Sequence, residues 1–157
     1  MKKKCTYHLN LINMKAIIKM IFNPGNYGKN INVVLLMLRV VAGVFMLTHG
    51  VGKFQNLMGN VVITFKDPLG IGATASLTLA VFSEVFCSIF LALGFATRFS
   101  ALSLLITMLV AALLAHAGDG FGKQELPLLY AAIYLALMLS GSGKISLDKL
   151  VYDKLTR

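Results

Sequence analysis

The sequence predicts an all-α integral membrane protein, built as a four-helix bundle with both termini in the cytoplasm. Hydrophobic residues make up 57% of the 157-residue chain and charged residues only 13%, and the mean hydropathy is +0.78. A soluble domain of this size needs more charge to cover its surface. The basic residues collect at the ends of long apolar stretches. The net charge of +9 therefore indicates orientation in a membrane rather than binding to nucleic acid.

Four apolar stretches are long enough to cross a bilayer core of about 30 Å, which takes roughly 20 helical residues. They must be helices because lipid offers the backbone no hydrogen-bond partners. The predicted spans cover about 32–53, 71–95, 99–117 and 126–142. Together they form one predicted domain over residues 31–143. The second span is the longest, and the fourth is short and must stand nearly upright in the membrane.

Lysine and arginine residues set the direction in which the chain crosses the membrane. Eleven lie before the first span, between the second and third, or after the fourth, namely Lys2, Lys3, Lys4, Lys15, Lys19, Lys29, Arg98, Lys144, Lys149, Lys154 and Arg157. The other two loops hold only Lys53, Lys66 and Lys123. Loops rich in lysine and arginine stay in the cytoplasm, so both termini are predicted to lie there.

Two basic segments flank the predicted domain. Residues 1–30 fit an amphipathic helix on the inner leaflet, because Lys15 and Lys19 lie one turn apart with isoleucines between them. A disordered basic tail and a translation start at Met14 are the alternatives for this segment. Residues 144–157 alternate leucines with charges and predict a short amphipathic helix at the interface.

Two residues of opposite charge, Arg39 and Glu84, lie deep within the apolar spans, where each would cost roughly 2.5–3.5 kcal/mol if unpaired. Arg39 lies about 10 Å and Glu84 about 15 Å from the cytoplasmic ends of their spans, at a rise of 1.5 Å per residue. Small residues on the same faces, Gly43, Gly50 and Ala80, let the two helices approach closely. We therefore predict a structural ion pair between Arg39 and Glu84. Proton transfer through Glu84 is the alternative.

A second polar group is predicted near the outer ends of the spans. His49 and Lys53 lie one turn apart on the first span, His116 ends the third, and Tyr130 lies near the outer end of the fourth. Histidine donates hydrogen bonds and exchanges protons, and lysine stabilises negative charge. These side chains therefore suit the carbonyl groups of a quinone, and we predict a quinone head-group pocket at this level.

Other ligands and roles compete with a quinone. A haem between His49 and His116 is geometrically conceivable, but the chain offers one such pair only. A metal would need a third ligand, and Asp119 is merely nearby, so no metal site is predicted. Alternatively, Lys53 extends to the lipid head groups and each histidine is hydrogen-bonded locally. No C-x-x-C motif is present, which argues against a thiol–disulfide enzyme.

Four stretches of the chain resemble the DoxX family, small four-helix membrane proteins of bacteria. They are "LRVVAGVFMLTHGVGKF", "FSEVFCSIFLALGFATRFSAL", "MLVAALLAHAGDGF" and "GSGKISLDKL", in the family's order over roughly residues 33–150. The resemblance implies a multi-pass protein of the bacterial cytoplasmic (inner) membrane. The family's polar signature, which is not an established catalytic motif, is matched by Arg39, His49, Gly50, Lys53, Glu84 and Arg98.

The resemblance also implies a role in redox chemistry. The family takes its name from a subunit of a thiosulfate:quinone oxidoreductase, and other members are associated with redox complexes. The implied function is a quinone-interacting or membrane-anchoring subunit of an oxidoreductase complex, with a membrane or soluble redox protein as partner. A homodimer is an additional expectation. A non-enzymatic scaffold and a small proton or solute transporter using Glu84 are the alternatives, since the chain has no self-contained catalytic motif.

Overall fold

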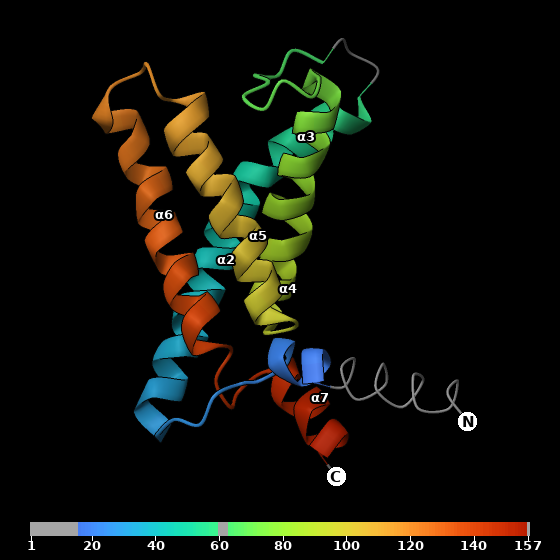
Figure 1. Ribbon diagram of the computed structural model, residues 1–157, viewed down its shortest axis with the longest axis vertical. Coiled ribbons are helices and arrows are strands. Elements are labelled where there is room, and N and C mark those ends of the chain that lie inside the picture. The colour runs from blue at the N-terminus through green and yellow to red at the C-terminus, as the bar shows by residue number, and fades with distance from the viewer. Residues whose placement is uncertain (1–15, 60–62, 157) are drawn as a thin grey trace, which may run out of the picture.

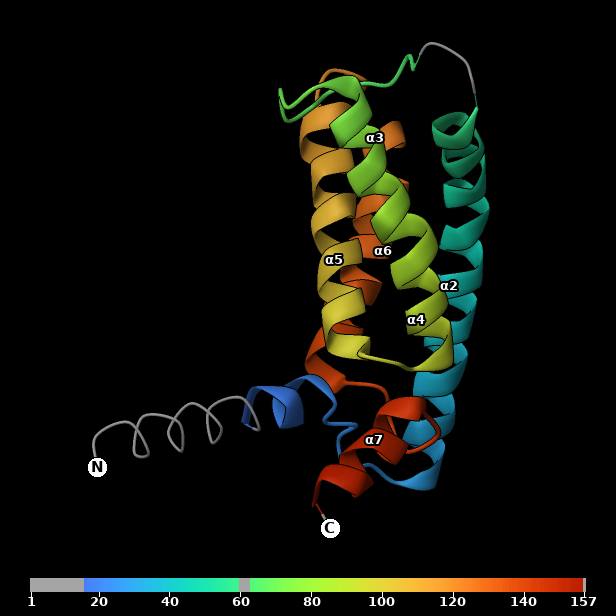
Figure 2. The same cartoon turned by 90° about the vertical axis from the view of Figure 1, so that its right-hand side faces the viewer.

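A computed structural model describes residues 16–59 and 63–156, and all regular elements in this part of the chain are helical (Figure 1). The long helices lie side by side along the long axis of the molecule. In chain order they are α2 (Lys29–Met58); α3 (Ala73–Val81), η1 (Phe82–Cys87) and α4 (Ser88–Leu93); α5 (Thr97–Val110) and η2 (Ala111–Ala115); and α6 (Phe121–Ser140). A short helical segment at 16–21 and α7 (Leu147–Thr156) lie at one end of the long helices (Figure 2).

Three helical runs are long and apolar enough to cross a membrane, namely Lys29–Met58, Ala73–Leu93 and Thr97–Ala115. Their exposed surfaces are rich in valine, leucine and phenylalanine, which indicates a lipid bilayer environment. The prediction of an all-helical membrane protein is confirmed. The fourth predicted span overlaps α6, which packs along α5. This helix starts at Phe121, five residues earlier than the predicted span, after Gly120 with φ +80°.

The first two helical runs approach closely through two glycines of α2. A Cβ atom on Gly43 would lie 2.8 Å from the Ser88 carbonyl oxygen, and one on Gly50 would lie 2.8 Å from the Glu84 carbonyl oxygen. Distances this short leave no room for a side chain. These contacts fix the antiparallel register of the two runs. Buried residues on the facing sides of the long helices form the core, among them Leu35, Ala42, Met46, Leu91, Leu104, Tyr134 and Leu137.

The end of the molecule near the two termini is held by buried polar groups. Arg39, which is 2% exposed, donates to the carbonyl oxygen of Ser142 at 2.5 Å and to that of Ile145. Asp148 of α7 accepts from the backbone N–H groups of Ala96 (2.6 Å) and Thr97 (3.0 Å) at the start of α5. Burial raises the pKa of Asp148, and the hydrogen bonds it accepts partly offset this effect. The C-terminal segment thereby fixes α2 and α5 relative to each other.

Two π-helical segments interrupt the helices toward the end of the molecule opposite α7: η1, midway along the run Ala73–Leu93, and η2, at the end of the run Thr97–Ala115. A π-turn inserts one extra residue per turn and is often found at functional sites. η1 contains Glu84, and η2 ends one residue before His116. In Figure 1 the pair α5 and α6 diverges from α3 toward this end. Glu84 thus lies within one π-segment, and His116 directly follows the other.

Candidate functional site

A cavity of about 340 Å³ lies among α2, η1, α5 and α6, and its lining extends to His116 after η2. The four residues predicted for the head-group pocket all line it: His49 and Lys53 from α2, His116 after η2, and Tyr130 from α6. The apolar part of the wall includes Met46, Met108 and Leu126. We call this the head-group cavity. It combines apolar surface with a few converging polar groups, which is the usual make-up of a ligand pocket.

The aromatic part of the head-group cavity is ordered by stacking. The ring of His49 meets that of Tyr130 edge-on, with 6.3 Å between the ring centroids. Tyr130 stacks in turn on the buried Tyr134, with centroids 5.9 Å apart. Such pairs add stability beyond the area they bury and restrict ring rotation. His49 keeps an exposed side chain despite this contact, so its imidazole remains accessible to a ligand.

His116 is oriented by an acidic neighbour in the loop after η2. Its Nδ1 lies 2.8 Å from Oδ2 of Asp119. The hydrogen bond with His116, and after it the positive charges of Lys123 and Lys66, lower the pKa of Asp119. Because the ionised carboxylate only accepts hydrogen bonds, Nδ1 carries the hydrogen, which leaves Nε2 of the neutral ring as an acceptor.

Glu84 forms an ion pair with Lys53 across the boundary between η1 and α2. The Lys53 Nζ atom lies 2.5 Å from Glu84 Oε1, with the glutamate side chain 3% exposed and the lysine 32% exposed. The second oxygen, Oε2, is buried and has no hydrogen-bond partner among the described residues. Lys53 also lies 5.8 Å from the centroid of the Phe65 ring. The lysine is thus a charge partner for a buried carboxylate as well as a cavity residue.

This arrangement corrects the predicted pairing of Arg39 with Glu84. Gly50 faces the Glu84 backbone, whereas the guanidinium of Arg39 lies against Gly94 at the end of α4. Ten residues separate Glu84 from Gly94, about 15 Å along a helix. Lys53, one turn beyond Gly50, is therefore the basic residue within reach. Depths counted from the presumed span ends were too coarse to find this register, which the two glycine contacts determine.

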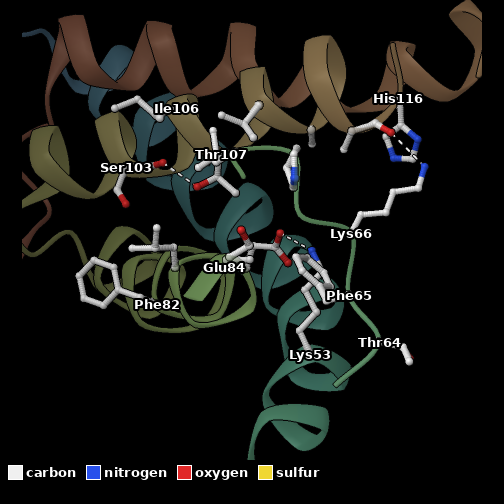
Figure 3. A pocket seen from close by; sticks show the side chains of 18 residues that line it. Lys53, Thr64, Phe65, Lys66, Phe82, Glu84, Ser103, Ile106, Thr107 and His116 are labelled. Atoms are coloured by element: carbon white, nitrogen blue, oxygen red, sulfur yellow. Dashed lines mark hydrogen bonds and ion pairs between the residues drawn. The ribbon is translucent and has the colours of Figure 1, made fainter. Parts of the chain in front are cut away.

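A second, larger cavity of about 500 Å³ lies beside the first, between α3, η1 and α5 (Figure 3). The two cavities share four lining residues, Lys53, Glu84, Ala111 and His116. Most of its wall is apolar, and the 64–69 segment forms another part. Ala80, predicted as a packing residue, also lines it. We call this the lateral cavity. Sequence reasoning missed it because apolar residues in a membrane helix carry no signal that separates a cavity wall from a lipid contact.

Asp67 holds the 64–69 segment against the start of α3. Its carboxylate accepts from the Gly72 backbone N–H and the Ser76 hydroxyl, both at 2.6 Å, and from the Ile71 backbone N–H at 3.2 Å. The Ser76 hydroxyl and then the Gly72 N–H lower the pKa of Asp67. The carboxylate thus stabilises the helix start and one wall of the lateral cavity together.

The described part of the structure offers few side chains for metal or thiol chemistry. Within residues 16–59 and 63–156 there is no cluster of three His, Cys, Asp or Glu side chains that would hold a metal ion. Cys87 is a free, buried cysteine, and Cys5 lies outside the described residues. Arg98, at the end near the termini, donates to the Met138 carbonyl oxygen at 3.0 Å. Arg98 therefore connects α5 to α6, away from both cavities.

The fold and the site define a helical membrane protein with two adjoining cavities toward one end of its apolar helices. A model of the DoxX family matches residues 34–117, more than half of the chain, and the protein belongs to this family. The matched region runs from α2 to just beyond His116 and includes both members of the Lys53–Glu84 pair. It ends before α6 and Tyr130. No curated protein and no solved structure matches the chain.

Proposed function

We propose that this DoxX family protein is a quinone-interacting subunit of a membrane oxidoreductase complex, with the quinone ring in the head-group cavity. One observation carries the proposal. Residues from α2, the end of η2 and α6, distant in sequence, line one cavity with two imidazoles, an ammonium group and a phenol. Its volume of about 340 Å³ falls within the range of small-ligand pockets.

The side chains fit the chemistry of a quinone ring. The Lys53 ammonium group can donate to a ring oxygen and stabilise negative charge there. His49 is accessible, and an imidazole can give or take a proton. The His49 and Tyr130 rings give the cavity an aromatic face. A bound quinone would supply the electron-accepting group. The protein would hold the quinone ring and exchange protons with it.

The proposal extends to the arrangement in the membrane. We propose α6 as a fourth span, completing a four-helix domain over residues 31–143 with basic segments 1–30 and 144–157 on the cytoplasmic side of a bacterial inner membrane. The charge distribution supports this orientation. Single cysteines at Lys123 and Lys154, in a Cys5→Ser/Cys87→Ser background, test it with an impermeant thiol reagent on spheroplasts. Labelling at 123 and not at 154 is expected, and the reverse pattern would invert the topology.

Binding to a purified protein in lipid nanodiscs tests the quinone site. We expect saturable binding of a short-chain quinone to the wild type, lost in His49→Ala and kept in Thr48→Ala, an exposed neighbour that lies outside the cavity. A reduced-minus-oxidised absorption spectrum of the same samples would reveal a haem instead. Equal binding by wild type and His49→Ala would refute the site. If no quinone binds, the anchoring role is favoured, and co-purification with a redox protein becomes its test.

A further inference from the structure

The lateral cavity has charged and titratable side chains at one end and uncharged side chains, most of them apolar, at the other. In Figure 3, Lys66 and His116 lie toward one end, while Phe82 and Ile106 lie toward the other. Leu79 and Ile106, on α3 and α5, are each 53% exposed. Both side chains line the lateral cavity and are exposed on helices long and apolar enough to cross a membrane, so the apolar end of the cavity is open at the surface between α3 and α5, where it would meet lipid.

The polar end adjoins the head-group cavity. Lys53, Glu84, Ala111 and His116 line both spaces, so one thin wall of side chains separates them. Of these, Lys53 is about one-third exposed and is paired with Glu84, and Ala111 is small. A molecule with its polar ring among His49 and Tyr130 therefore has a neighbouring apolar space that leads toward lipid.

We propose that the lateral cavity holds the isoprenoid chain of a quinone whose ring lies in the head-group cavity, with the chain leaving to the bilayer between α3 and α5. This inference rests on the proposed quinone function and specifies its substrate as a long-chain, lipid-soluble quinone. An isoprenoid chain is the occupant that matches the cavity, because its walls are mostly apolar and its polar end adjoins the ring site.

The chain should affect binding affinity through the space it needs rather than through the hydrophobic effect. A chain in a bilayer is already in hydrocarbon, so moving it into an apolar cavity gains little free energy. Wild-type protein should therefore bind long-chain and tail-less quinones with similar affinity when concentrations are expressed per lipid. Filling the lateral cavity should exclude the long-chain ligand and spare the tail-less one.

Two variants fill the cavity from opposite walls. Val110→Phe acts from α5 and Ala80→Leu from α3, and both residues line the lateral cavity without lining the head-group cavity. Leu109→Phe is the matched control, since it adds a ring one position away, at a residue that lines neither cavity. Both quinones, sharing one ring, are titrated into each protein in nanodiscs, and thermal unfolding is recorded for each variant.

We expect a loss of about tenfold or more in long-chain affinity for each filling variant, with tail-less affinity unchanged within about twofold. Leu109→Phe should match the wild type for both ligands. Undiminished long-chain binding to both filling variants would overturn the inference and leave the proposed function standing. Equal loss of both ligands in variants of wild-type thermal stability would place the ring in the lateral cavity and overturn it as well. Binding of neither ligand to wild type would remove the proposed function and this inference together.

Discussion

The region around α7 and the region around η1 treat buried charge in opposite ways. Near α7, Arg39 and Asp148 are bonded to the backbone: the terminal nitrogens of the arginine donate to two carbonyl oxygens, and the aspartate accepts from two N–H groups. In η1, Glu84 is paired with a lysine beside two cavities, and its Oε2 has no hydrogen-bond partner among the described residues. The first arrangement holds the C-terminal segment against α2 and α5. The second leaves polar side chains available to a ligand in the cavities.

Charged residues thus have two roles in this protein: some stabilise the fold, and others are placed to bind a ligand. A charge that is bonded to the backbone cannot be released without breaking the fold. A charge paired with one flexible side chain can exchange partners at lower cost. Substitutions near the termini should therefore act on stability, and substitutions at the cavities should act mainly on ligand binding.

The largest effect is expected for Arg39→Leu. The change leaves the carbonyl groups of Ser142 and Ile145 without their donor and Asp148 without a nearby positive charge. We expect the free energy of unfolding to fall by about 3–5 kcal/mol, measured by thermal or denaturant unfolding in detergent. Lys154→Leu, which removes an exposed charge at the same end, should change stability by about 0.5 kcal/mol or less. Similar losses for both variants would contradict the architectural role of Arg39.

A smaller loss of unfolding free energy is expected for Lys53→Leu, which leaves the buried Glu84 carboxylate without its lysine partner. We expect about 2–3 kcal/mol, less than for a fully buried pair, because the lysine side chain is 32% exposed. The double variant Lys53→Leu/Glu84→Leu should recover most of that stability without recovering quinone binding. A double-mutant cycle measures the coupling. If the double variant is as unstable as the single one, the pair is not the source of the loss.

Much of the fold could be predicted from the sequence because apolar length and charge placement report directly on a membrane. Both signals are local, and they located the helices that the structure shows. The start of α6 could not be found in this way. Its first turns carry Lys123 and Glu125 at an exposed helix end, where no hydrophobic period marks the boundary.

The site was only partly predictable from the sequence, because depth in the membrane can be counted along one helix but the register between two helices cannot. Depth along the membrane could group His49 with His116, because both stand near span ends. Partner choice for Glu84 depends on the register of two helices, and that register follows from where Gly43 and Gly50 allow contact. Sequence spacing names such glycines without saying which residue each one faces. The predicted partner of Arg39 was wrong because the sequence does not reveal this register.

Gly50→Ala tests that register and should cost less than either charge substitution. Its Cβ would fall 2.8 Å from the Glu84 carbonyl oxygen, so α2 must shift away from η1. We expect a loss of about 1–2 kcal/mol in unfolding free energy, together with weaker ligand binding because Lys53 and Glu84 move apart. Gly52→Ala is the control on the same helix, with open space at its Cβ. It should be neutral or stabilise by up to about 1 kcal/mol, and a loss equal to that of Gly50→Ala would argue against the close contact.

The smallest effect concerns pH and the wall of the lateral cavity. The lowered pKa of Asp67 means that its ionised form favours the folded state. This stabilisation is fully present above the ordinary carboxyl pKa of about 3.9 and is lost as pH falls through the lowered value. The melting temperature of wild type should therefore exceed that of Asp67→Asn near pH 6, and the difference should shrink below about pH 4. Other carboxyl groups, including Asp119 and Asp148, titrate in both proteins and largely cancel in the difference. A gap that stays constant from pH 6 to pH 3 would show that Asp67 acts through shape alone and that its charge does not hold the cavity wall.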